Sequence, residues 1–225
     1  MLVKDWMSRP VVTVDENNSM QTATILLKKH EIRMLPVMKN NKLTGIITDR
    51  DLKKASASEA TTLEIHELLY LLTKIKVKDI MTKDPITIPV DYTVEETAEL
   101  LLKHKISGAP VLDKESAVVG VITQTDLFRV IVSLTGVGKK GIQFGFKLED
   151  RPGSIKEVAD VIREYGGKMV SILTSYDGAP EGYRWAYIRM HEIDRSRIEN
   201  LKQDLLEKAP LLYMVDHRED RREIY

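Results

Sequence analysis

The 225-residue chain is predicted to be an α+β protein of α/β sandwich-like architecture, in which two tandem β-α-β-β-α repeats precede a separate βαββαβ domain. Two observations carry this prediction. The segment VKDWMSRPVVTV from Val3 returns as VKDIMTKDPITI from Val77, an offset of 77 minus 3, or 74. A glycine-rich stretch at residues 134–141 then interrupts the repeat pattern and marks a flexible joint.

Composition and charge exclude several classes of protein. The 34 Lys and Arg residues balance the 34 Asp and Glu residues, so no net field attracts nucleic acid or anionic lipid. The absence of cysteine removes disulfides, thiolate catalysis and cysteine-based zinc sites. The N-terminus lacks a signal-peptide core, and every apolar run is too short to span a bilayer. We therefore expect a cytoplasmic protein with neither nucleic acid nor membrane as a partner.

The offset of 74 holds without a gap as far as Pro36-Val37, which match Pro110-Val111. After one inserted residue the offset becomes 75, and it holds from Gly45 to Leu52. Two such units normally pack on each other to share a core. We therefore predict repeat 1 over residues 1–58 and repeat 2 over residues 77–133, with a helical connector over residues 59–76. The matched pairs include Met7 with Met81, His30 with His104, Pro36 with Pro110, Gly45 with Gly120, Thr48 with Thr123 and Asp51 with Asp126.

Each copy is predicted to contain the same elements in the same order. A short extended segment leads to an amphipathic helix, which Ser19 caps in the first copy and a Thr93–Glu96 capping box opens in the second. Two strands follow, and a second helix begins after each Thr-x-x-Asp. The predicted extended segments are 11–14, 35–38 and 43–48 in the first copy and 86–88, 109–112 and 118–123 in the second.

The end of each repeat has chemistry that suits a nucleotide. In Gly45–Asp51 (GIITDRD) and Gly120–Asp126 (GVITQTD), a buried strand ends in Thr and a helix begins near Asp. The exposed amides of a helix start favour phosphate, the Thr hydroxyl can donate to it, and an Asp one turn on can accept both hydroxyls of a ribose. The segments before each first helix, with the residues before Pro36 and Pro110, could form an apolar slot for adenine.

The paired repeats resemble the tandem CBS domains of a Bateman module over roughly residues 1–133. The resemblance rests on the opening Met-Ser/Thr, the Pro-Val strand and the Gly-x-x-Thr-x-x-Asp ending of each copy. In that family the Thr typically contacts phosphate and the Asp contacts ribose, which implies adenosine nucleotide binding. The implied nucleotide-binding residues are Ser8, Pro10, Val11, Val12, Met34, Pro36, Thr48, Arg50, Asp51, Thr82, Pro85, Ile86, Ala109, Pro110, Thr123 and Asp126.

The two nucleotide sites are predicted to be unequal. Arg50 could add charge for phosphate at the first site, whereas its counterpart Thr125 cannot, so the first site is better suited to di- and triphosphates. Residues 108–109 leave more room beside the base than residues 34–35 do, so the two effects compete and the sequence does not rank the sites. The alternative for each motif is purely structural, because Thr ending a strand and Asp capping a helix are common without any ligand.

A second domain is predicted over residues 142–220. Alternating apolar residues from Ile142 to Leu148 predict a strand, and a helix over 155–162 ends at Gly166-Gly167. A hairpin over 169–190, a second helix and a last strand complete the order βαββαβ, which is a ferredoxin-like split unit. Residues 221–225 are predicted to be a solvated tail of mixed charge.

With Asp-Arg-Pro-Gly between its first strand and first helix, this domain looks like an ACT domain. In that family the loop often binds an amino acid or other small effector, and Gly153 can bring its backbone close to a ligand. The alternative is a tight turn without ligand, since many ACT domains serve only for pairing. The whole arrangement is similar to acetoin utilization AcuB-type proteins. The implicated loop residues are Glu149, Asp150, Arg151, Pro152, Gly153 and Ser154.

The expected function is that of a non-enzymatic regulatory sensor. An adenosine nucleotide (AMP, ADP, ATP or a related adenosyl ligand) would bind the CBS pair as a regulatory ligand, and an amino acid or small effector would bind the ACT domain of a homodimer that acts on an unknown regulated protein. No catalytic residue, metal site or required cofactor is predicted, because the five histidines show no ligand spacing and no nucleophile elbow or P-loop is present. The alternative is a structural or dimerisation scaffold with degenerate pockets.

Overall fold

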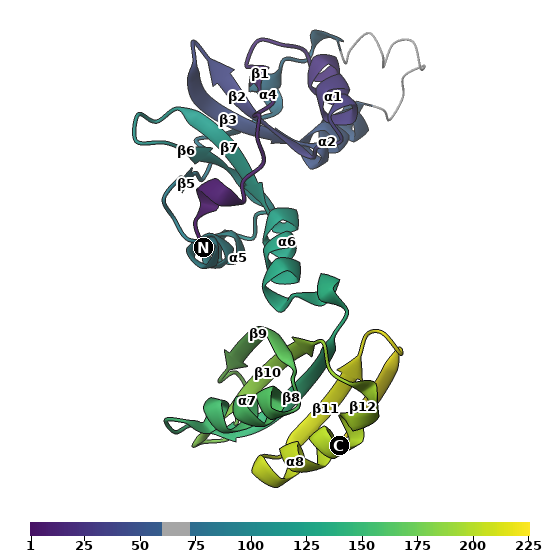
Figure 1. The fold of residues 1–225 in the computed structure, drawn as a ribbon. Coiled ribbons are helices and arrows are strands. Elements are labelled where there is room, and N and C mark those ends of the chain that lie inside the picture. Colours follow the sequence, from purple (N-terminus) through teal and green to yellow (C-terminus); the bar gives the residue numbers. More distant parts are fainter. Residues whose placement is uncertain (60–72) are drawn as a thin grey trace. The chain divides into compact units, whose positions relative to one another are not determined.

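The computed structural model describes residues 1–59 and 73–225, which form two compact units, Met1–Phe128 and Arg129–Tyr225 (Figure 1). The predicted connector helix falls largely on residues 60–72, which lie outside the described residues. The boundary between the units lies inside helix α6 (Gln124–Thr135), whereas the sequence placed it in the glycine-rich stretch. The helix ends at Thr135 because the next residue, Gly136, takes a left-handed φ of 63°.

The N-terminal unit confirms the two predicted β-α-β-β-α repeats. In each repeat a short first strand runs parallel to the second strand, which is antiparallel to the third. Repeat 1 contains β1 (Val14–Asp15), α1 (Met20–Lys29), β2 (Met34–Lys39), β3 (Lys42–Thr48) and α2 (Asp49–Glu59). Repeat 2 contains α4 (Val77–Ile80), β4 (Thr82–Lys83), β5 (Ile88–Pro89), α5 (Val94–His104), β6 (Gly108–Leu112), β7 (Val118–Thr123) and α6. A short 3-10 helix, η1 (Val3–Asp5), opens repeat 1 at the position that α4 takes in repeat 2.

The first helix of each repeat begins as predicted. Ser19 Oγ accepts a hydrogen bond of 3.1 Å from the backbone N–H of Thr22, one of the amides that the helix itself leaves unpaired. In repeat 2, Thr93 and Glu96 form the reciprocal capping box, with hydrogen bonds of 3.1 and 2.7 Å. These short-range contacts fix where α1 and α5 begin.

The opening segment of each repeat pairs with the sheet of the other repeat, which the sequence boundaries do not show. Strand β4, from repeat 2, extends the sheet of repeat 1, with Thr82 opposite Ile46. Ser8, from the start of repeat 1, is bridged to Val121 of β7 by two backbone hydrogen bonds of 2.8 and 3.3 Å. The repeats are therefore interlocked, and residues 1–8 belong structurally with repeat 2.

In two places a methionine of one opening segment packs against a strand glycine of the other repeat, which explains part of the exchange of opening segments. A Cβ placed on Gly45 would lie 2.5 Å from Sδ of Met81, and one placed on Gly120 would lie 2.7 Å from Cγ of Met7. Any larger residue at either glycine would collide with the opening methionine of the other repeat. The glycine and methionine that recur in both copies are therefore partners across the repeats.

The cores of the two repeats reflect the same exchange. Val77 is buried in the core of repeat 1, and Val3 is buried in the core of repeat 2. The buried residues of the first core are Val14, Met20, Ala23, Leu27, Leu35, Val37, Ile47, Leu52 and Val77. Those of the second are Val3, Met7, Ile88, Leu101, Ala109, Val111 and Ile122.

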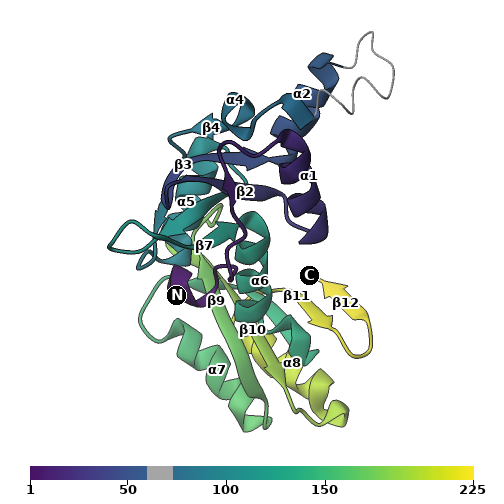
Figure 2. The same ribbon diagram turned by 90° about the horizontal axis from the view of Figure 1, so that it is seen from above.

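The C-terminal unit has the predicted βαββαβ order with one additional strand. Its five-stranded antiparallel sheet has the order β12-β11-β8-β10-β9, and α7 and α8 pack on one face of it (Figures 1 and 2). The elements are η2 (Val137–Lys139), β8 (Ile142–Glu149), α7 (Ser154–Glu164), β9 (Lys168–Ser175), β10 (Tyr183–His191), η3 (Arg195–Arg197), α8 (Ile198–Lys208), β11 (Leu211–Asp216) and β12 (Arg221–Ile224).

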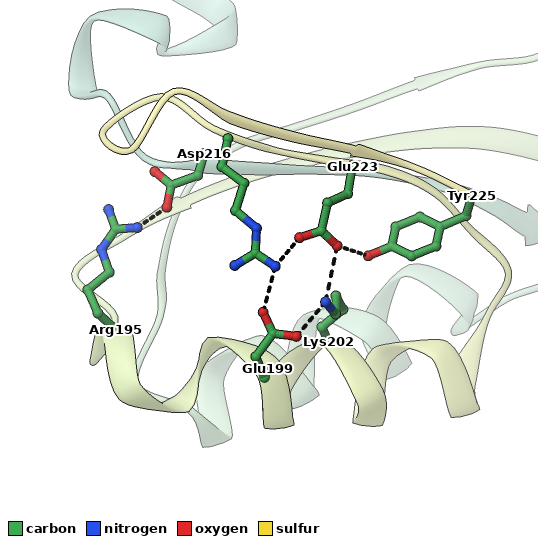
Figure 3. Close-up of polar contacts among 7 residues, drawn as sticks. Arg195, Glu199, Lys202, Asp216, Glu223 and Tyr225 are labelled. Carbon is green, nitrogen blue, oxygen red and sulfur yellow. Dashed lines mark hydrogen bonds and ion pairs between the residues drawn. The ribbon is translucent and has the colours of Figure 1, made fainter.

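The prediction of a solvated tail is wrong for residues 221–224, which form the edge strand β12 paired with β11. The charges that suggested a tail are paired across the hairpin with helix α8 (Figure 3). Lys202 lies 3.1 Å from Glu223, and Arg221 lies 2.8 Å from Glu199. Because Arg221 and Glu223 have opposite partners on α8, and Arg222 has one in Asp220, the strand can fold back with little apolar pattern of its own.

Candidate functional site

The two Gly-x-x-Thr-x-x-Asp motifs fold alike, each at the junction of a strand and a helix. In the first, Thr48 Oγ1 donates a 2.7 Å hydrogen bond to Asp51 Oδ2, which also accepts one of 2.9 Å from the backbone N–H of Thr48. In the second, Thr123 and Asp126 make the same two bonds at the same distances. Each pair therefore forms a capping arrangement that fixes the first turn of α2 or α6.

The exchange of opening segments brings a residue of the other repeat close to each motif. Ser8 Oγ donates a 3.2 Å hydrogen bond to Asp126 Oδ1, and Asp126 is 3% exposed. Thr82, the counterpart of Ser8, lies beside β3 next to the first motif, but no hydrogen bond to Asp51 forms among the described residues. Asp51 is only half-buried, so the two carboxylates differ in solvation.

The sequence analysis assigned the residues of each site to a single repeat. It therefore did not predict that a segment of the other repeat lies beside each Thr-Asp pair. The segments carrying Pro10–Val12 and Pro85–Ile86 start beside the opposite repeat's Thr-Asp pair, because Ser8 and Thr82 lie there. Apart from the exposed Pro10, these residues are half-buried. The sequence signal that could have shown the exchange is the glycine that recurs with methionine, since a strand glycine marks close approach of another chain segment.

Strands β2 and β6 each begin opposite one of the two threonines, and their first residues contact each other across the repeats. Met34 pairs with Thr48, and Gly108 pairs with Thr123. A Cβ on Gly108 would lie 2.8 Å from Cε of Met34, so the Met34 side chain fills the room that the sequence assigned to Gly108. The remaining strand residues of the predicted site, Pro36, Ala109 and Pro110, are buried in their sheets.

Arg50 lies in the first turn of α2, directly before Asp51, and is exposed. No ion pair holds its guanidinium among the described residues, whereas its neighbour Asp49 pairs with Lys53 at 3.3 Å. The first motif therefore offers an available positive charge at a helix start, where the backbone amides also favour anions.

The predicted effector loop of the C-terminal unit is closed by its own ion pairs. Arg151 donates to Glu149 at 2.8 Å and to both carboxylate oxygens of Glu157, each at 2.8 Å. These hydrogen bonds raise the pKa of Arg151 and lower the pKa of Glu157. Pro152 and Gly153 are exposed at the turn, and Gly153 has the left-handed φ of 92° that glycine tolerates best.

The other polar residues of this loop are also engaged. Asp150 accepts a 3.1 Å hydrogen bond from the Tyr176 hydroxyl and lies 3.7 Å from Nε of Arg184. Ser154 is 4% exposed, and its Oγ accepts a 3.1 Å hydrogen bond from Arg184. The loop therefore presents three carboxylates around two arginines that are already paired, which disfavours a carboxylate ligand.

No cluster of three or more His, Asp and Glu side chains among the described residues could hold a metal ion. No helix in the described part of the chain is long and apolar enough to cross a membrane.

The two repeats seen in the structure are also matched by the model of a known domain family. The family model of the CBS domain matches residues 3–58 and 77–133, which together make up half of the chain. The chain belongs to the CBS domain family. The matched ranges lie within residues 1–58 and 77–133, and the opening segment of each pairs with the sheet of the other.

Curated relatives align with the same region. A CBS domain-containing protein of Dictyostelium discoideum is 35% identical over 135 residues, covering 60% of this chain and 93% of that protein. The L-aspartate semialdehyde sulfurtransferase of Methanocaldococcus jannaschii is 38% identical over 130 residues, 57% of this chain. The match covers only 23% of the sulfurtransferase, so this chain matches a small part of that protein.

Solved structures give the same result. The CBS domain pair of protein MJ0100, in complex with 5′-methylthioadenosine and S-adenosyl-L-methionine, is 36% identical with a TM-score of 0.50 and covers 58% of this chain and 95% of that chain. The acetoin utilization protein AcuB of Vibrio cholerae is 26% identical with a TM-score of 0.51 and covers 62% of this chain and 96% of that chain.

Proposed function

We propose that this protein is a non-catalytic regulatory sensor whose CBS pair binds an adenosine ligand, either AMP, ADP, ATP or a related adenosyl compound. The observation that carries the proposal is the pair of Thr-Asp constellations, each at a strand-helix junction and each beside a segment of the other repeat. Support comes from the MJ0100 domain pair, whose structure contains two adenosyl ligands.

In this proposal the aspartates bind the ribose. The threonines face the phosphate of a nucleotide, or the group that takes its place in another adenosyl compound. Thr48 and its own amide occupy one carboxylate oxygen of Asp51, so the other oxygen can accept a ribose hydroxyl while the helix cap stays intact. At the second site Ser8 already donates to the second oxygen of Asp126, and a ribose would have to compete with it. With Arg50 beside it, the first site is the better one for phosphorylated nucleotides.

The C-terminal unit is proposed to be an ACT-type domain that pairs in a homodimer and passes the ligand state to a regulated protein. Its support is the βαββαβ order, the Asp-Arg-Pro-Gly turn before α7 and the likeness of the CBS pair to AcuB. An amino acid effector at residues 149–154 is the sequence-derived form of this proposal. The paired charges of that loop favour an effector that does not depend on a free arginine there.

A second candidate function is a scaffold whose pockets are degenerate. It is favoured by the fact that both Thr-Asp pairs already serve as helix caps and the effector loop is closed by its own ion pairs. The scaffold predicts that ligands do not change stability or assembly, whereas the sensor predicts that they do.

The test is thermal unfolding of the full chain with AMP, ADP, ATP and S-adenosylmethionine. A ligand at a hundredfold excess over Kd stabilises the protein by about 2.7 kcal/mol. Asp51→Ala combined with Asp126→Ala should remove this shift, measured against the variant's own midpoint, whereas the neighbouring Asp49→Ala should keep it. A shift that is unchanged in the double variant would place the ligand elsewhere.

A further inference from the structure

The face of the C-terminal sheet opposite α7 and α8, here called the open face, carries a buried arginine. Arg189 alternates along β10 with Ile188 and Met190, which point into the core beneath the helices. It is 3% exposed, and no carboxylate among the described residues forms an ion pair with it. A buried charge without an opposite partner destabilises the folded state, so its retention calls for a reason.

The hydrogen bonds of Arg189 go to neutral acceptors only. Its Nε donates to the backbone carbonyl of Thr135 at 2.7 Å, and its Nη2 donates to Oε1 of Gln143 at 2.6 Å. Its Nη1 is buried and has no partner. The guanidinium therefore keeps one nitrogen, Nη1, without an acceptor, and it holds its positive charge inside the protein, where burial lowers its pKa.

A second unpartnered nitrogen lies in the same region. Nε2 of His217, the residue after β11, is buried without a hydrogen-bond partner, while its backbone N–H donates to Gly141 at 3.2 Å. Arg189 and Val215 both pair with Gln143 of β8, and His217 follows Val215 by two residues, in alternation with the buried Met214 and Asp216, so it lies on the open face near Arg189. Burial and then the charge of Arg189 lower the pKa of His217. Tyr213 lies beside Arg189 as well, with its ring over Gly145.

We propose that Arg189 and His217 form a binding site for a small carboxylate on the open face. The two oxygens of a carboxylate match the two unused donors, Nη1 of Arg189 and an N–H at Nε2 of His217, and its single negative charge balances the guanidinium. The site is independent of the nucleotide sites in the CBS pair. It offers an arginine without an ion pair among the described residues, whereas Arg151 of the loop is paired with Glu149 and Glu157.

The segment that covers Arg189 gives the ligand a route. Thr135, whose carbonyl holds Arg189, also accepts a 3.0 Å hydrogen bond from Ser171, and a Cβ on Gly136 would lie 3.8 Å from Cδ of Arg189. The exposed Lys139 and Lys140 follow on the same segment. A carboxylate approaching this cluster meets positive charge first and reaches Nη1 when the glycine-rich segment shifts.

The experiment titrates the full chain with acetate and with glycine, using sodium chloride at equal ionic strength and inorganic phosphate as comparisons. We expect acetate or glycine to raise the unfolding midpoint in a saturable way and chloride to leave it unchanged. Arg189→Gln and His217→Phe should each weaken the apparent affinity at least tenfold. Lys147→Gln, which removes a cation that lies over the Tyr183 ring on the same face, should leave it unchanged.

A direct readout guards against variants that fail to fold. In the wild-type chain the ¹⁵N resonance of His217 Nε2 should shift on addition of acetate, because that nitrogen gains a hydrogen-bond acceptor. Absence of any carboxylate effect, or an equal effect in the Arg189→Gln variant, would overturn the site. Tighter binding of phosphate than of either carboxylate would overturn the assignment of ligand class.

Discussion

Substitution of Gly120 by alanine tests the interlocking of the two repeats. The new Cβ would lie 2.7 Å from Cγ of Met7 and 3.2 Å from its Cβ, whereas unstrained carbon atoms lie about 3.5 to 4.0 Å apart. Overpacking of this kind typically costs about 1–3 kcal/mol. Since all three of the nearest atoms belong to the Met7 side chain, Met7→Ala should relieve the strain.

The assay is a double-mutant cycle by urea unfolding, with Trp185→Phe as the common background so that Trp6 reports on the N-terminal unit. The double variant Met7→Ala with Gly120→Ala should be more stable than the sum of the single effects by about 1–3 kcal/mol. The equivalent cycle at Gly45 and Met81 should show only partial relief, because the backbone carbonyl of Thr82 also lies 2.9 Å from the new Cβ. Additive effects in the first cycle would refute the packing of Met7 on Gly120.

Three further predictions follow from named contacts. Thr93→Ala should destabilise the N-terminal unit by about 1 kcal/mol in urea unfolding, because it removes the cap of α5; an effect below about 0.3 kcal/mol would contradict this. Arg50→Gln should weaken ATP binding more than adenosine binding in calorimetry at low salt, and equal losses would remove Arg50 from the phosphate site. Lys202 and Arg221 lower the pKa of Glu199, and Tyr225 and Lys202 lower the pKa of Glu223, each from a usual value of 4.5. The stability that these two ionised carboxylates contribute is therefore present above pH 4.5 and is lost as the pH falls below it. The Glu199→Gln, Glu223→Gln double variant should therefore lose less stability between pH 6 and pH 3 than the wild-type chain does, and an equal loss would contradict the pairing.

Local and repeated patterns predicted most of the fold. The offset of 74, the caps at Ser19 and Thr93 and the alternation from Ile142 to Leu148 depend on neighbours in sequence, and the structure confirms them. The exchange of opening segments was not predicted because β4 has two residues, too few for any periodicity. Strand β12 was missed because Ile224 is the single apolar residue of its four, and because two of its charges gain partners on α8, which is distant in the sequence.

The candidate sites were predicted unevenly for similar reasons. The Thr-Asp pairs were placed correctly at the strand-helix junctions, since both residues lie within one turn of the chain. The contribution of Ser8 to Asp126 joins residues 118 positions apart, and the filling of the Gly108 space by Met34 also crosses the repeats. Arg189 could not be recognised from the sequence, because an arginine that alternates with core residues normally faces solvent.

The measurement that tests the central proposal most directly is isothermal titration of the wild-type chain with AMP, ATP and S-adenosylmethionine, repeated with Asp51→Ala, Asp126→Ala and the control Asp49→Ala. The sensor account predicts saturable binding of at least one adenosine ligand, loss of binding when both site aspartates are replaced, and unchanged binding in the Asp49→Ala variant. Absence of binding by every adenosine ligand, or binding that survives both substitutions in a folded protein, would contradict it.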